Sequence, residues 1–361
     1  MKVLFDHQIF TMQKYGGISQ YFAELYKRLP EDSTRISMRY SRNEYLNQIT
    51  GLTFPIVNLP SQKYMEMVGY YLIDYLNQRN ILYNLKHFEF DVFHPTYYNP
   101  HFLKYLRGKP YVLTVFDMAH ERYPEQFGDS AMVIRNKKLT IENATELIAL
   151  SQATKDDMLQ YYDIDPDKIT VIHLATSLTP ITNLVQPTFR YVLFVGSRAA
   201  RYKGFYEFAT ATSQLLREDK TLHVICAGGG PFTNEEICMF YPDIQSRVHQ
   251  TFFKNNEDLA RLYQRAEAFV FPSWCEGFGI PQLEAMTCSC PMACSDISVF
   301  HEIAGDAAEY FEVRNPRSVR FAITRAIENK LVGKERAKGF SWDKMAEETM
   351  RVYNKVKEET Q

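Results

Sequence analysis

The sequence has no strong excess of either charge and no long apolar run. Its 41 lysine and arginine residues balance 43 aspartate and glutamate residues, which leaves a formal net charge of −2 at pH 7. A broad nucleic-acid-binding surface usually shows as a basic excess, so no nucleic-acid partner is expected. No apolar run approaches the roughly 20 residues that cross a bilayer, and no charged leader precedes an apolar segment. We therefore expect a cytoplasmic protein that is soluble or rests on the inner face of a membrane.

Cysteine is absent from the first half of the chain, and its later spacing does not fit a metal site. The six cysteines are Cys226, Cys238, Cys275, Cys288, Cys290 and Cys294. They fall mostly in apolar contexts and lack the paired C-x2-C of structural zinc sites, so free core thiols are expected. Asp163-Ile164-Asp165 imitates a D-x-D metal motif, but Pro166 places it in a linker. The sequence predicts neither a metal nor a cofactor.

Apolar strand-like runs alternate with helical segments along both halves of the chain. A length of 361 residues suits two domains of ordinary size. The polar, proline-bearing segment 175–188 is the expected hinge, and a helix is expected over 344–357. The alternation predicts an α/β protein with two doubly wound parallel sheets. The expected strands are Lys2–Phe5, Asp91–His94, Tyr111–Phe116, Glu146–Leu150, Ile169–His173, Tyr191–Val195, Leu222–Ala227 and Ala268–Phe271.

The segment 269–286 combines a buried strand, a glycine turn and a helix flanked by two glutamates. Gly277 and Gly279 permit close approach of a ligand to the backbone, and the helix that follows directs free N–H groups at it. Such a terminus favours a diphosphate, whereas Glu276 and Glu284 are suited to accept hydrogen bonds from hydroxyls of a sugar or a ribose. This predicts a sugar-nucleotide site. The alternative is that both glutamates are ordinary solvated charges.

Two further turns carry residue types that bind phosphate. After the strand at 191–195, Gly196 is followed by Arg198 and Lys203, which together could neutralise a nucleoside diphosphate without a metal. A merely basic, solvated loop is the alternative. Near the N-terminus, Gly16 and Gly17 precede a helix expected over 19–29, again allowing close approach of a phosphate or an acceptor. This turn lacks the G-x-G-x-x-G fingerprint, which disfavours a nicotinamide enzyme.

These motifs together resemble those of the retaining glycosyltransferases of family four. Similar segments recur through most of the chain, at 169–172, 227–231, 304–308 and 340–343. The resemblance implies the GT-B fold, in which two doubly wound Rossmann-like domains have parallel sheets that face an interdomain cleft. It implies an acceptor-binding domain at 1–180 and a nucleotide-sugar-binding domain at 187–340. A C-terminal helix at 341–361 would pack back on the first domain.

The resemblance also implies roles for individual residues. Arg198 and Lys203 would bind the donor diphosphate, Glu276 the hydroxyls of the transferred sugar, and Glu284 the ribose. His120, which follows a strand at its carboxyl end, matches a family histidine near the donor sugar. The catalytic set is thus Arg198, Lys203, Glu276 and His120. The donor-binding set is Gly16, Gly17, Gly196, Arg198, Lys203, Glu276, Gly277, Phe278, Gly279, Ile280 and Glu284.

One position departs from the family pattern. Family members often have a histidine before the aspartate at this strand end, whereas Phe116 precedes Asp117 here. His120 is therefore preferred as the histidine of the site.

The implied reaction is transfer of a sugar with retention of anomeric configuration, with a donor phosphate oxygen as the base. The motifs look most like those of bacterial polysaccharide mannosyltransferases, which favours GDP-mannose as donor and a glycan or lipid-linked acceptor. Three alternatives stay open: a UDP-sugar-dependent transferase of the same family, a sugar-nucleotide epimerase of the same fold, and an inactive sugar-nucleotide-binding protein.

The segment 62–88 mixes apolar and basic residues in a way that suits a long amphipathic helix. Its apolar residues are expected to form a stripe that faces the core. The alternative is a surface for a lipid-linked oligosaccharide at the membrane, extended by the segment 101–109. The apolar residues concerned are Tyr64, Met67, Tyr70, Tyr71, Leu72, Tyr75 and Leu82.

Overall fold

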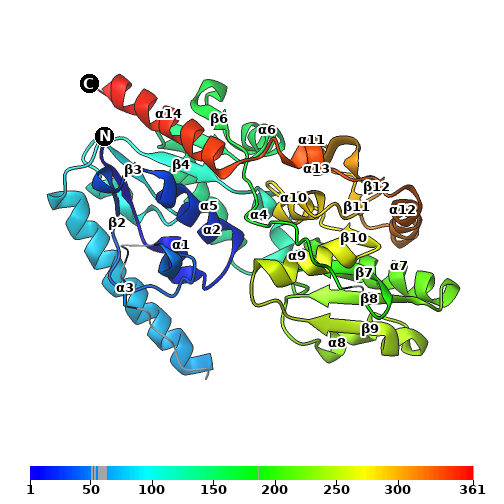
Figure 1. Ribbon diagram of the computed structural model, residues 1–361. Helices are drawn as coiled ribbons and strands as arrows, with labels where there is room; N and C mark the ends of the chain where they lie inside the picture. The colour runs from blue at the N-terminus through cyan, green and yellow to red at the C-terminus, as the bar shows by residue number, and fades with distance from the viewer. Residues whose placement is uncertain (50–51, 53, 56–62, 186, 361) are drawn as a thin grey trace.

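The computed structural model describes residues 1–361 except 50–51, 53, 56–62, 186 and 361. It is an α/β protein with two Rossmann-like domains side by side, each built on parallel strands covered by helices (Figure 1). In the described part of the chain, no helix is long and apolar enough to cross a membrane. The helices are α1 (Gln8–Met12), α2 (Gly17–Arg28), α3 (Lys63–His87), α4 (Ala119–Arg122), α5 (Ser130–Glu142), α6 (Gln152–Tyr161), α7 (Phe205–Glu218), α8 (Asn234–Cys238), α9 (Asn256–Arg265), α10 (Ile280–Thr287), α11 (Ser298–Ala304), α12 (Pro316–Asn329), α13 (Lys334–Ala337) and α14 (Trp342–Thr360).

The first domain is built on two sets of three parallel strands joined by a single bridge. One has the order β2 (Thr34–Ile36), β1 (Val3–Phe5), β3 (Val92–His94), and the other the order β4 (Val112–Val115), β5 (Glu146–Ala149), β6 (Ile169–Val171). An isolated parallel bridge between Phe93 and Tyr111 joins β3 to β4. The predicted parallel sheet is confirmed, although β4, β5 and β6 end one or two residues earlier than expected.

The second domain contains one parallel sheet. Its order is β12 (Glu309–Phe311), β11 (Met292–Ser295), β10 (Ala268–Phe271), β7 (Arg190–Val195), β8 (Leu222–Ala227) and β9 (Val248–Thr251). The sequence analysis missed β2, β9, β11 and β12. Three of these are edge strands of three or four residues, and β11 reads Met-Ala-Cys-Ser, so none carries the β-branched run on which strand prediction depends.

The C-terminal helix α14 crosses from the second domain to the first (Figure 1). Its Tyr353 hydroxyl lies 2.6 Å from Nδ1 of His94 at the end of β3, and Lys355 Nζ lies 2.7 Å from a Glu146 carboxylate oxygen in β5. Burial lowers the pKa of His94 to about 3, so the ring is neutral at physiological pH. The proposed domain boundaries themselves stay a prediction.

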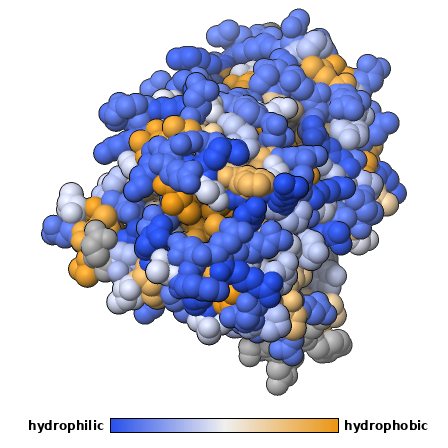
Figure 2. All heavy atoms as spheres, turned by 90° about the vertical axis from the view of Figure 1, so that its right-hand side faces the viewer, coloured by the Kyte–Doolittle hydropathy of each residue, from blue (hydrophilic) through white to orange (hydrophobic). Residues whose placement is uncertain are grey.

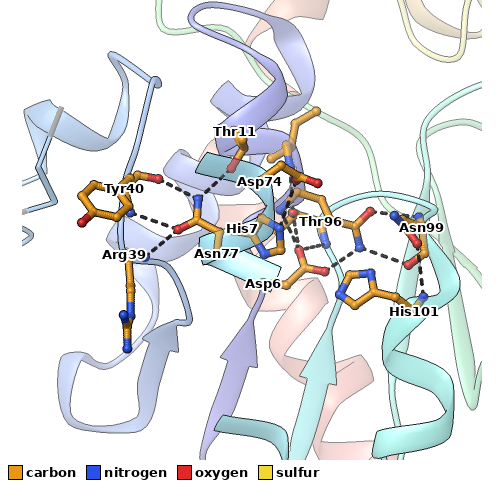
Figure 3. A network of polar contacts seen from close by, with 12 residues as sticks. Asp6, His7, Thr11, Arg39, Tyr40, Asp74, Asn77, Thr96, Asn99 and His101 are labelled. Carbon is orange, nitrogen blue, oxygen red and sulfur yellow. Dashed lines mark hydrogen bonds and ion pairs between the residues drawn. The ribbon is translucent and has the colours of Figure 1, made fainter. Parts of the chain in front are cut away.

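A network of buried polar groups fixes the carboxyl edge of β1 to its neighbours (Figure 3). The Asp6 carboxylate accepts hydrogen bonds from the side-chain amide of Gln8 at 2.6 Å and from the backbone N–H of Thr96 at 2.9 Å. His7 lies 3.3 Å from Asp74 of α3, and Asn77 of α3 accepts from the backbone N–H groups of residues 39 and 40. The contact between His7 and Asp74 and the hydrogen bonds accepted by Asn77 therefore attach α3 to the rest of the first domain.

The expectation that α3 turns its apolar stripe to the core is wrong for most of the named residues. Its buried positions are Ile73, Asn77, Ile81, Asn84 and Leu85, whereas Met67, Tyr71, Leu72 and Tyr75 are exposed. The N-terminal half of the helix projects from the first domain, beyond the strands drawn there (Figure 1). Gln62, the expected first residue of the helix, lies outside the described residues.

The second domain presents a mainly hydrophilic face, on which apolar residues form separate groups (Figure 2). Five of the six cysteines are buried free thiols, as expected, and Cys238 at the end of α8 is exposed. Its exposure corrects the prediction that all six fill the core. Among the described residues, no group of three or more His, Cys, Asp or Glu side chains is placed to hold a metal ion.

Candidate functional site

The turn after β10 brings Glu276 to the edge of the second sheet that faces the first domain. Gly279 has a φ of +94°, which only glycine adopts readily, and it precedes α10 directly. No side chain among the described residues caps α10 at this residue. Pro281 has no N–H and the Gln282 N–H donates to the carbonyl oxygen of Gly279 at 3.1 Å, so what the start of α10 offers a ligand is mainly the positive end of its helix dipole. Anion binding at this turn stays a prediction.

Lys203 and Glu276 come together as a tight ion pair. Lys203 Nζ lies 2.6 Å from Glu276 Oε1, and both side chains keep a partly exposed surface. The close approach depends on Gly204, where an added Cβ would lie 2.0 Å from the carbonyl oxygen of Pro272 at the end of β10. Burial alone would lower the pKa of Lys203, but the Glu276 carboxylate more than offsets this and the pKa is raised. Lys203 is therefore a permanent cation at the cleft.

The Glu276 turn also contacts the first domain directly. An added Cβ on Gly277 would lie 1.5 Å from the carbonyl oxygen of Phe116, so only glycine fits. The carbonyl oxygen of Gly277 accepts hydrogen bonds from the hydroxyls of Ser151 at 2.8 Å and Thr154 at 3.1 Å. Glycine at position 277 therefore lets the two domains pack closely together. Its α-carbon faces the first domain and does not leave the space for a ligand that the sequence had predicted.

His120 reaches the same region from the first domain. Its ring stacks on Phe127 with centroids 4.1 Å apart, and Phe127 lies 5.3 Å from the ring of Tyr202. Tyr202 is the neighbour of Lys203, whose Nζ lies 4.9 Å from that ring. Burial lowers the pKa of His120, the Asp117 carboxylate opposes this, and Lys137 adds to it. A series of ring contacts through Phe127 and Tyr202 therefore links His120 to Lys203, without a direct contact between them among the described residues.

Glu284 lies within α10, one helical turn after its first residue, Ile280. The Tyr263 hydroxyl donates to Glu284 Oε2 at 2.9 Å. Burial raises the pKa of Glu284 to about 7, and the hydrogen bond from Tyr263 acts in the opposite sense. A carboxyl group with a pKa near neutrality can exchange a proton as a ligand hydroxyl arrives.

Arg198 is placed differently from the other predicted residues. Its guanidinium is buried and donates to the carbonyl oxygens of Gly228 and Gly230 at 2.7 Å each, and to Glu236 at 3.2 Å. Gly228, Gly229 and Gly230 all have positive φ, which turns their carbonyls toward the arginine. Arg198 therefore holds the glycine loop 228–230 beside Gly196. Its direct bond to a diphosphate stays a prediction.

Among the remaining residues predicted to contact the donor, Gly17 and Ile280 meet each other, whereas Gly16 and Phe278 contact other parts of the chain. Gly17 lies opposite Ile280, because an added Cβ on Gly17 would lie 3.4 Å from Ile280 Cδ1, so these two meet across the cleft. Gly16 has an extended backbone, and an added Cβ would collide with the side chain of Gln13. The Phe278 ring is buried against His173 and Phe340, so only its backbone can face a ligand.

Sequence reasoning missed a contact between the domains made by Glu302. Its carboxylate accepts from the backbone N–H groups of Gln152 at 2.8 Å and Ala153 at 3.1 Å, at the N-terminus of α6. It also lies 2.8 Å from His173 Nε2. Nothing in the sequence near residue 302 marks this role, since the helix end and the carboxylate are 149 or more residues apart. The sequence analysis also missed Phe127 and Tyr202, which lie between His120 and Lys203, because no motif distinguishes them from other aromatic residues.

Two family models cover nearly the whole chain. "Glycosyltransferase Family 4" matches residues 15–179, and "Glycosyl transferases group 1" matches residues 182–341. O-antigen chain mannosyltransferase B of Escherichia coli is 24% identical over 77% of this chain and 78% of its own. Alpha-maltose-1-phosphate synthase of Mycolicibacterium smegmatis is 28% identical over 71% of this chain and 76% of its own.

Solved structures share the fold. Sucrose-phosphate synthase from Thermosynechococcus elongatus superposes with a TM-score of 0.76 over 98% of both chains, at 16% identity. Anabaena HepE in complex with UDP and glucose superposes with a TM-score of 0.72, at 16% identity, over 98% of this chain and 99% of its own.

Proposed function

Because the chain belongs to glycosyltransferase family four, we propose that it transfers mannose from GDP-mannose to a hydroxyl of a glycan or lipid-linked oligosaccharide. It is a glycosyltransferase of polysaccharide synthesis, and relatives named O-antigen mannosyltransferases support mannose. Other relatives are named alpha-maltose-1-phosphate synthase, which favours a different donor, so the donor needs a direct test. The observation that carries the proposal is the Lys203–Glu276 ion pair at the turn that leads into α10.

In this proposal each group meets the donor through its own chemistry. Lys203 and the positive end of the α10 dipole stabilise the charge that grows on the leaving diphosphate, so no metal is required. Glu276 exchanges its bond to Lys203 for hydroxyls of the transferred sugar, and Glu284 accepts from the ribose. His120 lies beside the sugar on the side of the first domain. The new bond forms with retention of configuration, a donor phosphate oxygen taking the acceptor proton.

A thermal-shift panel with GDP, UDP, dTDP and ADP and their sugar conjugates tests the donor, because a ligand that binds only the folded protein stabilises it. The proposal expects a selective shift with GDP and GDP-mannose. A selective shift with UDP would be consistent with the family and would contradict GDP-mannose as the donor.

The transfer reaction itself tests the mechanism. It must persist in excess EDTA and give a product of unchanged anomeric configuration by NMR. Conversion of the donor to a new sugar nucleotide without an acceptor would indicate an epimerase instead.

We also propose that α3 rests on the cytoplasmic face of a membrane. Met67, Val68, Tyr71 and Leu72 are each about half exposed or more on the projecting half of this helix. Aromatic and apolar side chains of this kind insert at the headgroup level of a bilayer. The segment 101–109, which the membrane alternative added to this surface, does not extend it, since Phe102 and Leu106 are buried. Flotation with anionic liposomes tests this, and loss of flotation is expected on Tyr71→Ser with Leu72→Ser.

A further inference from the structure

The turn that follows β4 carries Asp117 and His120 to the cleft, and it rests on a buried ion pair. Lys137 of α5 lies 2.9 Å from Glu121 of α4, and their side chains are only 1% and 2% exposed. Lysine and glutamate are rarely buried to this degree, and each must be paired to avoid a large desolvation cost. This pair lies directly behind the residues that face the donor site.

Lys137 uses its ammonium group to hold the turn itself. Besides Glu121, Nζ donates to the carbonyl oxygen of Asp117 at 2.9 Å. It also lies 5.1 Å from the ring centroid of Tyr98, whose hydroxyl accepts from the backbone N–H of Phe116 at 2.9 Å. One buried cation therefore fixes both the first residue of the turn and the strand end before it.

Glu121 completes the arrangement on the other side. Its second oxygen accepts from the Tyr162 hydroxyl at 2.6 Å, so both carboxylate oxygens are bonded. Glu121 is the residue after His120 in the short helix α4. Because the two residues are adjacent in α4, the position of Glu121 also determines the position of the His120 backbone.

Stability alone does not account for such a pair. Replacing a buried ion pair by neutral residues of similar size is often neutral or stabilising, because the desolvation cost disappears. What a neutral pair would not supply is a strong donor to the Asp117 carbonyl. Misplacement of a catalytic group by about 1 Å can cost on the order of a hundredfold in rate.

We propose that Lys137 is a positioning residue, which sets the 117–120 turn against the Lys203–Glu276 pair through the Asp117 carbonyl and Glu121. The proposal rests on the proposed function, in that the turn must face the donor sugar. Lys137 itself touches no reacting atom.

The double variant Lys137→Met with Glu121→Gln tests this without leaving an unpaired buried charge. Its matched control is Lys138→Met with Glu142→Gln, which removes a neighbouring pair on the same helix α5 that is 3.6 Å apart and exposed to solvent. Release of GDP from GDP-mannose gives kcat and KM, and hydrogen exchange of the peptide 116–121 gives the order of the turn.

The double variant should lower kcat roughly 10- to 100-fold with little change in the donor KM. It should also speed exchange at 116–121, while the control keeps wild-type values for all three. Wild-type kcat and wild-type exchange in a folded double variant would overturn the positioning role. If the double variant does not fold, Lys137→Gln with Glu121→Gln decides, because it also leaves no buried charge and still removes the ammonium donor to the Asp117 carbonyl; a lower kcat at unchanged KM is expected, and a wild-type kcat would contradict the positioning role. Should the wild type release no GDP, the proposed donor is wrong, and the exchange measurement still tests Lys137.

Discussion

Lys203 Nζ and Glu276 Oε1 lie 2.6 Å apart at the edge of the second sheet that meets the first domain. The two residues are 73 positions apart in the chain, and glycine at position 204 allows the two turns to touch. The pair places a positive charge beside a carboxylate at the turn that leads into α10. Each member can leave the other for a part of a sugar nucleotide, the cation for phosphate and the anion for hydroxyls.

Lys203→Met is expected to lower kcat by about 10²-fold, because a preorganised charge on the leaving group is lost. The protein should remain folded, since the pair is partly exposed. Lys220→Met, an exposed lysine on the same domain, is the control and should keep wild-type kinetics. Steady-state release of GDP measures both. Wild-type turnover by folded Lys203→Met would remove Lys203 from the mechanism.

Arg198→Lys should destabilise the protein as well as slow it. A lysine cannot reproduce the planar fork that now donates to two glycine carbonyls and to Glu236, so buried acceptors lose their partner at roughly 1–3 kcal/mol each. We expect a clear fall in the melting temperature of Arg198→Lys but not of Arg201→Lys, an exposed neighbour. An unchanged melting temperature with about 10²-fold slower turnover would instead show that Arg198 meets the diphosphate directly.

Donor binding should strengthen as the pH rises from 6 to 8. The pKa of Glu284 is about 7 in the protein, so its carboxyl is largely protonated at pH 6 and ionised at pH 8. Ribose hydroxyls that donate to it favour the ionised form, so binding releases a proton. Isothermal titration with GDP-mannose, whose phosphates do not titrate in this range, should show this dependence in the wild type and in Glu328→Gln, and lose it in Glu284→Gln.

Tyr263→Phe provides an independent check on Glu284. The Tyr263 hydroxyl lowers the Glu284 pKa, so its removal should move the transition in donor affinity to higher pH. An affinity that does not change with pH in any of these proteins would argue against the ribose role.

Acid should weaken the contact that Glu302 makes between the domains. Burial alone would raise the pKa of Glu302, but hydrogen bonds from His173, Gln152 and Ala153 outweigh this and lower it. A carboxyl with a lowered pKa stabilises the folded protein above its unfolded pKa of about 4.3, and that contribution is lost as the pH falls through the folded value. Glu302→Gln should therefore lower the melting temperature at pH 7 and lose this effect at about pH 3.

The matched control is Glu335→Gln, whose carboxylate pairs with Lys338 at the surface. It should leave the melting temperature unchanged at pH 7, because exposed pairs contribute little. Equal effects of the two substitutions at pH 7 would show that Glu302 does not join the domains.

Much of the fold follows from local patterns in the chain. Apolar runs such as Leu222–Ala227 are buried on both faces in a parallel sheet, so they stand out without any knowledge of their neighbours. Gly279 was readable as a turn residue because it lies between an apolar strand and a helix, and its positive φ excludes other residues. The edge strands β2, β9 and β12 could not be predicted from the sequence, because pairing with a neighbouring strand stabilises them more than the strand propensity of their own residues.

The sequence by itself determined the two parallel sheets and the residue types that gather at the site, because strand burial, glycine turns and charge are properties of short segments. Only the tertiary structure decided which of those residues meet. It paired Lys203 with Glu276, turned Arg198 into the glycine loop, left half of α3 exposed, and buried Lys137 behind the 117–120 turn. These outcomes depend on contacts across the two domains or between distant segments, where packing and desolvation, rather than local propensity, fix the direction of each side chain.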